Sequence, residues 1–262
     1  KCTRPAQRVC FDTAGPFNPG PHGERYAVIG VDEYSGNILV EPNVSKGSEA
    51  ASTALTRNIR FYSVLGHRLV TAKSDQGTEF AGAFKEHAEE YNVNQEYSAP
   101  YTPQQNGRAE RGWLKLAHVM GCMLTHAAMG NIGYIWTEVM YHAAAMINST
   151  HSVSVGGSPY EILRRYKDET EYLAPSMEGI MIFGAKVIIH GPSLPKQWKK
   201  LSKITPKGVI GFYVGRSRKA PHVGRFWIPD VGDGRALFVE TLHATVQESL
   251  AEGRRTAEPP EL

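Results

Sequence analysis

The chain has 262 residues, of which 41% are hydrophobic, with a net charge of +3 and three cysteines. This length allows one large domain or two small ones with a substantial core. Its longest apolar runs fall far short of the ~20 residues of a membrane helix, and three scattered cysteines exclude a disulfide framework or a four-cysteine zinc site. We therefore expect a soluble protein of a reducing compartment.

The chain starts at Lys1 with neither an initiator methionine nor a leader, which predicts a piece of a longer polypeptide. Apolar runs and Gly/Pro turns then predict a linker, three neighbouring strands and a helix. In order, these cover residues 1–7, 8–16, 25–34, 37–44 and 45–64. Asp12 lies within the first strand.

The next strand is predicted to end at Asp75, and a polar, glycine-bearing segment at 102–107 leads into a long helix. The predicted elements are strand 67–75, helix 79–92, strand 93–100 and helices 108–129, 135–149 and 159–165. Residues 8–165 thus alternate strands and helices, which predicts an α/β domain with a mixed five-stranded sheet and helices on its faces.

A polar stretch with proline and glycine at 166–179 is predicted to be a second linker. Beyond it, short apolar runs at 180–191, 208–216, 224–230 and 235–242 are separated by Gly/Pro turns. They predict a small all-β, barrel-like domain over residues 180–247. The tail at 248–262 is predicted to be disordered.

Three carboxylates stand out from the surface acids. Asp12 and Asp75 are embedded in predicted apolar strands, where an unpaired carboxylate is costly, and Glu110 lies near the start of a helix. Phosphoryl transfer on DNA uses two Mg²⁺ ions about 3.5–4 Å apart, and Mg²⁺ prefers hard oxygen ligands. We expect one Asp to bridge both ions. By position alone, however, Asp32 at a strand end competes with Asp12.

A family resemblance separates these alternatives. The stretches FDTAGP (11–16), SDQGTEF (74–80) and APYTPQQNGRAER (99–111) resemble the integrase core of copia-type LTR retrotransposons, a member of the DDE polynucleotidyl transferase superfamily. The likeness continues through IWTEVMYHAAAMINST, SPYEIL, IFGAKVIIH and GVIGFYVGRS, and so covers most of residues 8–247.

The resemblance implies an RNase H-like fold and a catalytic, metal-binding triad of Asp12, Asp75 and Glu110 with two Mg²⁺ or Mn²⁺ ions. Asp32 would then be structural. It also implies that the loop residues Gln104, Gln105 and Asn106 contact the DNA end. Some residues depart from the family pattern, among them Arg108, which stands where valine is usual.

Basic residues predict the remaining DNA contacts. Ten Lys or Arg and no acid lie between positions 186 and 225, and phosphate neutralisation gives binding without sequence preference. The predicted contacts to DNA are Arg108, Arg111 and Lys115 beside Glu110, and Lys196, Lys199, Lys200 and Lys203 in the basic block. The long helices are candidates for a homo-oligomer interface.

These features predict an integrase that trims the 3′ ends of a linear element and joins them to double-stranded target DNA. The expected location is the nucleus, with a cytoplasmic stage in virus-like particles and no membrane partner. Two alternatives remain open at this point. One is an RNase H-type nuclease that stops at hydrolysis, and the other is a domesticated DNA-binding derivative without catalysis.

Overall fold

The computed structural model describes residues 2–98, 107–127, 133–165, 180–190, 208–220, 222–229 and 236–246. The chain divides into two compact units. One consists of Lys1–Cys122 with Asn131–Ser176, and the other of Met123–Gly130 with Met177–Leu262. The predicted linker at 166–179 and the predicted tail at 248–262 lie outside the described residues.

The first unit is built on a five-stranded sheet with the order β3-β2-β1-β4-β5. The strands are β1 (Arg8–Ala14), β2 (Tyr26–Asp32), β3 (Ile38–Asn43), β4 (Thr71–Ser74) and β5 (Asn94–Tyr97). The pairs β1–β2 and β2–β3 are antiparallel, whereas β1–β4 and β4–β5 are parallel. This arrangement confirms the mixed sheet predicted from the sequence.

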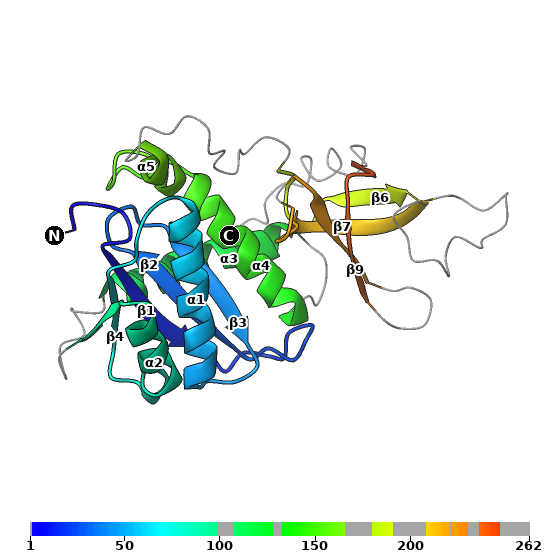
Figure 1. The fold of residues 1–262 in the computed structure, drawn as a ribbon. Coiled ribbons are helices and arrows are strands. Elements are labelled where there is room, and N and C mark those ends of the chain that lie inside the picture. Colours follow the sequence, from blue (N-terminus) through cyan, green and yellow to red (C-terminus); the bar gives the residue numbers. More distant parts are fainter. Residues whose placement is uncertain are drawn as a thin grey trace, which may run out of the picture. The chain divides into compact units, whose positions relative to one another are not determined.

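One face of this sheet carries the apolar core. Side chains alternate along a strand, so Val9 and Phe11 of β1 point to the same face, and both are fully buried. They pack with residues of α1 (Ser48–Val64) and α2 (Ala83–Glu90), which lie side by side in Figure 1. Gly30 of β2 faces the same helix layer, since a Cβ there would lie 2.7 Å from Asn58 Oδ1 of α1.

The opposite face is covered by α3 (Gly107–Ala127), which contacts β2 closely. A Cβ on Gly112 would come within 2.7 Å of Val31 Cγ2, so glycine at this position lets the helix approach the sheet. The next helix, α4 (Trp136–Ser149), ends in Asn148, whose side-chain amide accepts from Ile38 N–H and donates to Ile38 C=O, each at 2.8 Å. This pair of hydrogen bonds satisfies the backbone of β3 at the edge of the sheet.

Three shorter helical segments complete the described part of this unit: η1 (Thr78–Phe80), η3 (Gly133–Ile135) and α5 (Pro159–Arg165). Leu163 of α5 joins the core cluster under α1. The structure thus confirms helices on both faces of the sheet. Among the described helices, none has the length and apolarity needed to cross a membrane.

The second unit contains a sheet with the order β10-β6-β7-β8-β9, in which every pair is antiparallel. Its strands are β6 (Lys186–His190), β7 (Gly208–Arg216), β8 (Gly224–Ile228), β9 (Leu237–Thr241) and β10 (Ala244–Val246). Val187, Tyr213 and Phe226 form its buried centre. The described strands of residues 186–246 thus form one antiparallel sheet, which agrees with the predicted β-rich region, while an all-β domain and its closure into a barrel stay predictions.

Two details of this unit differ from the sequence prediction. The strand predicted at 180–191 begins at Lys186, because Gly184 adopts a positive φ of 78° and Ala185 N–H turns back to Ile182 C=O. Residues 244–246 were not predicted as a strand, yet they pair with β6 as β10. Only three residues long, β10 gives almost no periodic signal, so its pairing partner defines it.

Candidate active site

Two neighbouring parallel strands position the two predicted aspartates. Cys10 of β1 pairs with Lys73 of β4, so Asp12 and Asp75 each follow a paired residue by two positions. Side chains two residues apart share a face of the sheet. Asp12 therefore points away from the Val9 and Phe11 core, toward the face covered by α3. Glu110 lies in the first turn of α3.

The electrostatics of Asp12 show that the three acids lie near one another. Burial raises the pKa of Asp12 to about 6. The backbone N–H of Thr13, which donates to Asp12 Oδ1 at 2.9 Å, acts in the opposite direction. The negative charges of Asp75 and Glu110 contribute to this raised value after burial. Asp75 and Glu110 thus lie near enough to Asp12 for their negative charges to act on it, although the three residues come from different parts of the chain.

The chemistry of these donors suits a hard divalent cation, which prefers carboxylate oxygens and would relieve their repulsion. The side chains are not gathered into a coordination shell, however. Across the residues that the structure describes, no three His, Cys, Asp or Glu side chains form a group that could hold a metal ion. Asp75 and Glu110 are both exposed. The donor types fit, and ligation requires the carboxylates to approach one another.

Asp32, the rival of Asp12, has a different environment. Its side chain is fully buried and accepts hydrogen bonds from Ala6 N–H at 3.0 Å and from Ser35 N–H at 2.9 Å. The Ser35 hydroxyl donates a third bond at 2.6 Å. A carboxylate whose lone pairs are used in this way fixes the β2–β3 turn to the N-terminal segment. This environment agrees with the structural role implied by the family resemblance.

Sequence reasoning missed Glu79, a fourth acid at this site. It is only 6% exposed, its Oε1 lies 3.1 Å from Lys46 Nζ, and its charge also raises the pKa of Asp12. Gly77 separates it from Asp75. A Cβ at position 77 would lie 2.6 Å from Glu79 Oε2 and 3.0 Å from Asp75 Oδ1. Glu79 belongs to the SDQGTEF stretch, which was the signal that could have singled it out.

The predicted DNA contacts fall into three groups. Gln104, Gln105 and Asn106, like Lys196, Lys199, Lys200 and Lys203, lie outside the described residues. Arg111 and Lys115 are exposed on α3. Arg108 is half-buried, and its Nη2 donates to the backbone carbonyl of Glu33 at 2.6 Å. Its guanidinium therefore lies between α3 and the β2–β3 turn.

One cation of the predicted basic block is offset by an acid from another strand. Arg225 Nη1 of β8 lies 3.0 Å from Glu240 Oε1 of β9, and its guanidinium lies over the ring of Phe238. Glu240 follows the block in sequence and pairs with it across the sheet. Folding thus brings an acid from outside residues 186–225 next to this basic block, so the positive charge around Arg225 is lower than the count along the sequence suggests.

No family model matches the chain, but several curated proteins do, among them two Pol polyproteins. The chain is 26% identical over 164 residues to the Pro-Pol polyprotein of feline foamy virus, covering 62% of this chain and 13% of that protein. It is 27% identical over 213 residues to the retrovirus-related Pol polyprotein from transposon TNT 1-94 of Nicotiana tabacum, covering 79% of this chain and 15% of that protein. The chain therefore spans less than one-sixth of each relative.

Solved structures resemble the chain in fold. A chain of the simian T-cell lymphotropic virus intasome, in complex with PP2A regulatory subunit B56 gamma, matches 94% of this chain with a TM-score of 0.53. The match covers 80% of that chain at 14% identity. The catalytic core domain of BIV integrase matches 62% of this chain and 97% of its own length, at 16% identity and a TM-score of 0.49.

Proposed function

We propose that the chain carries an integrase core of the DDE superfamily, which cuts and joins DNA with divalent metal ions. Its likeness to Pol polyproteins and the fold that it shares with an intasome chain support this proposal. The proposed reactions are trimming of the 3′ ends of a linear element and joining of those ends to target DNA. One observation carries the proposal. The negative charges of Asp75, which follows β4, and of Glu110, in the first turn of α3, both contribute to the raised pKa of Asp12 in β1. The copia type stays a prediction, since the relatives include foamy viruses as well as a plant transposon.

In this proposal Asp12, Asp75 and Glu110 hold two Mg²⁺ or Mn²⁺ ions. Bound ions activate the attacking hydroxyl and stabilise the leaving oxygen of the phosphodiester. The chain's own residues orient the ligands. Thr13 N–H fixes Asp12 Oδ1 at 2.9 Å, and Gly77 N–H fixes Asp75 Oδ1 at 3.0 Å.

Protonation of Asp12 sets the pH range in which we expect the proposed activity. With a pKa of about 6, Asp12 is ionised at pH 7 and takes up a proton below pH 6. Because a protonated carboxyl is a poor ligand for Mg²⁺, the proposed activity decreases as the pH falls through 6.

The proposed partners are the DNA ends of the element, target DNA and further copies of this chain. The fold shared with an intasome chain supports these partners. We also propose that the protein acts in the nucleus after a cytoplasmic stage in virus-like particles, since joining to chromosomal target DNA requires access to it.

The test is a strand-transfer assay with a labelled duplex in Mg²⁺ or Mn²⁺. We expect the wild-type chain to join the duplex to target DNA, and Asp75→Asn and Glu110→Gln each to reduce joining at least about 100-fold, as for groups that stabilise the transition state directly. Glu86→Gln is the matched control, because Glu86 is an exposed acid on α2, which covers the other face of the sheet.

Each outcome of this assay has a defined meaning. Joining that persists in both triad variants would exclude the assigned triad. Cleavage without joining would favour a nuclease of the RNase H type, and DNA binding without either reaction would favour a non-catalytic derivative. Loss of joining in the Glu86 control as well would show that the assay reports protein stability.

A further inference from the structure

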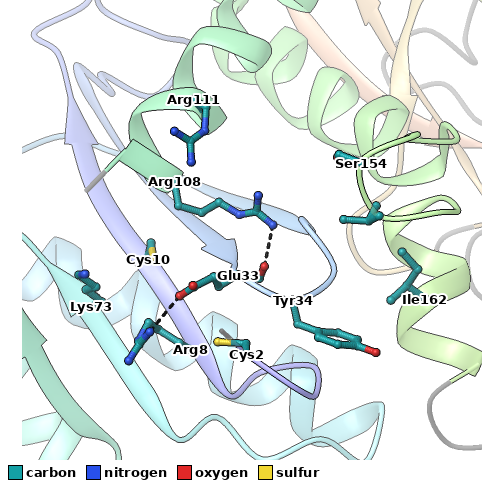
Figure 2. Close-up of a pocket in the computed structure, with 11 residues that line it drawn as sticks. Cys2, Arg8, Cys10, Glu33, Tyr34, Lys73, Arg108, Arg111, Ser154 and Ile162 are labelled. Carbon is teal, nitrogen blue, oxygen red and sulfur yellow. Dashed lines mark hydrogen bonds and ion pairs between the residues drawn. The ribbon is translucent and has the colours of Figure 1, made fainter. Parts of the chain in front are cut away.

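A basic cavity lies on the same face of the sheet as the carboxylates. Its volume is about 510 Å³, within the ~300–1,000 Å³ of ordinary ligand pockets. Strands β1 and β4, the β2–β3 turn and the first turns of α3 form most of its wall, and Ser154 and Ile162 lie on the far side. Val155 also lines the cavity. Figure 2 shows Arg8 and Arg108 on either side of Glu33, with Lys73 beside Cys10.

Resting on the proposed function, we propose that this cavity binds phosphate groups of the DNA strand that enters the carboxylate site. Four cations line it, namely Arg8, Lys73, Arg108 and Arg111, against the single acid Glu33. Phosphate is the anion that clustered Arg and Lys side chains recognise best, through charge-assisted and bidentate hydrogen bonds.

The cations that line the cavity differ in whether an acid neutralises them. Arg8 is neutralised by Glu33 at 3.2 Å and by Glu96, whose Oε2 lies 2.8 Å from Arg8 Nε. Within the described ranges, no ion pair joins Lys73, Arg108 or Arg111 to an acid. Three cations therefore remain for a ligand.

Among the cations that line the cavity, Arg108 shows most clearly the need for a negatively charged ligand. It is half-buried, its only described hydrogen bond goes to an uncharged carbonyl, and its Nε is buried without a partner. A guanidinium withdrawn from water without a counter-charge is costly, so an anion in the cavity would be favoured. The thiol of Cys10 does not supply that charge, since burial raises its pKa to about 12.

The register connects the cavity to the reaction site. Lys73 and Cys10 are paired across β4 and β1, and Asp75 and Asp12 follow them by two residues on the same strands. Two residues along a strand advance about 6.6 Å. The cavity residues Cys10 and Lys73 thus lie about two strand residues from the carboxylates, so cations that attract a DNA phosphate lie next to a site whose metal-free carboxylates repel it.

The test measures binding without catalysis. In EDTA, so that metal bound by the carboxylates plays no part, fluorescence anisotropy with single-stranded and duplex DNA and calorimetry with inorganic pyrophosphate are applied to Lys73→Gln and Arg108→Gln. We expect each variant to bind DNA and pyrophosphate about tenfold more weakly than wild type, as for loss of one charged hydrogen bond. The slope of log affinity against log salt should fall by about one. Lys85→Gln, on the exposed side of α2, is the control.

Thermal unfolding accompanies each variant, and Lys73→Gln keeps the test valid where Arg108→Gln fails to fold. Unchanged affinity of Lys73→Gln for both ligands would overturn the proposal. Weaker pyrophosphate binding with unchanged DNA binding would also overturn it, because the cavity would then serve a free polyphosphate. Asp75→Asn should bind DNA at least as tightly as wild type in EDTA, because it removes one of the carboxylates that repel DNA in the metal-free protein, so failure of the proposed catalysis would leave this result distinct.

Discussion

The two faces of the sheet in the first unit differ in the residues they carry: one face packs the apolar core, and the other carries the charged residues of the candidate site. On the face covered by α1 and α2, Val9 and Phe11 are fully buried in an apolar core, and Asp32 is locked by three hydrogen bonds. On the face covered by α3, the same strand presents Arg8 and Cys10 to a cavity, and Asp12 to the charges of Asp75 and Glu110. Alternation along one strand thus separates stability from chemistry.

The comparison predicts opposite consequences for neighbouring residues. A change on the α1 face should alter the free energy of unfolding and affect activity only through folding. A change on the α3 face should alter metal, DNA or proton binding while the fold persists. The following substitutions test that separation, beginning with the largest expected change in stability.

Phe11→Ala should lower the free energy of unfolding by about 3–5 kcal/mol, because it removes a fully buried ring that packs edge-on against Phe84. Urea unfolding followed by circular dichroism measures the change. Phe11→Leu is the control and should cost less than half as much, since it keeps most of the buried volume. A loss below about 1 kcal/mol for Phe11→Ala would show that this face is not the core.

Asp32→Ala should lower the free energy of unfolding by about 2–3 kcal/mol, because the buried donors of Ala6 and Ser35 lose their acceptor. The same urea experiment measures the effect, and metal binding by the folded variant should be unchanged. If instead metal binding is lost while stability is retained, Asp32 and not Asp12 is the ligand.

Asp12→Asn should stabilise the metal-free protein at pH 7. The folded-state pKa of about 6 lies above the unfolded value near 3.8, so the folded state holds the proton longer and stability falls as the pH rises from 4 to 6. Asparagine removes this loss, which we estimate at about 1 kcal/mol once solvent screening of the partly exposed group is allowed for.

Thermal unfolding between pH 4 and pH 8 checks this prediction. The stability difference between Asp12→Asn and wild type should grow from pH 4 to pH 6 and then level off. A difference that is constant over the whole range would contradict the raised pKa of Asp12.

Gly77→Ala should have the smallest effect on stability, below about 1 kcal/mol, because the atoms that its Cβ would meet are the ends of the Glu79 and Asp75 side chains, which can turn aside. It should nevertheless reduce strand transfer about tenfold or more, since the added Cβ would lie 2.6 Å from Glu79 Oε2 and 3.0 Å from Asp75 Oδ1, and so must shift Glu79 and crowd the Asp75 carboxylate. Gly36→Ala, at a β2–β3 turn position with open space around it, is the control for turn strain alone. Equal activity of Gly77→Ala and wild type would show that Asp75 need not be held in place.

Much of the fold could be predicted from local patterns. Apolar runs and turns gave the five strands of the first sheet, and the helix over 108–129 lies within two residues of α3. Strand boundaries were less accurate, as at Lys186, because a glycine with positive φ ended a continuous apolar run there. β10 was missed since its three residues are defined by pairing with β6.

The site was only partly accessible from the sequence. Asp12 and Asp75 stood out as acids in apolar strands, and Glu110 through its motif. The Lys46–Glu79 pair and the cavity around Arg108 depend on contacts between segments far apart in the chain. No local pattern encodes them, because the side-chain direction at a helix start is set by what the helix packs against.

The central claim is that three acids on the α3 face act as one divalent-metal site. Calorimetric titration with Mn²⁺ at pH 7 and pH 5 tests it most directly, on wild type, Asp12→Asn, Asp75→Asn and Glu110→Gln. The account predicts two ions per chain at pH 7, weaker binding at pH 5 as Asp12 takes up its proton, and loss of one or both ions in each variant. Equal stoichiometry and affinity in all four proteins at both pH values would contradict it.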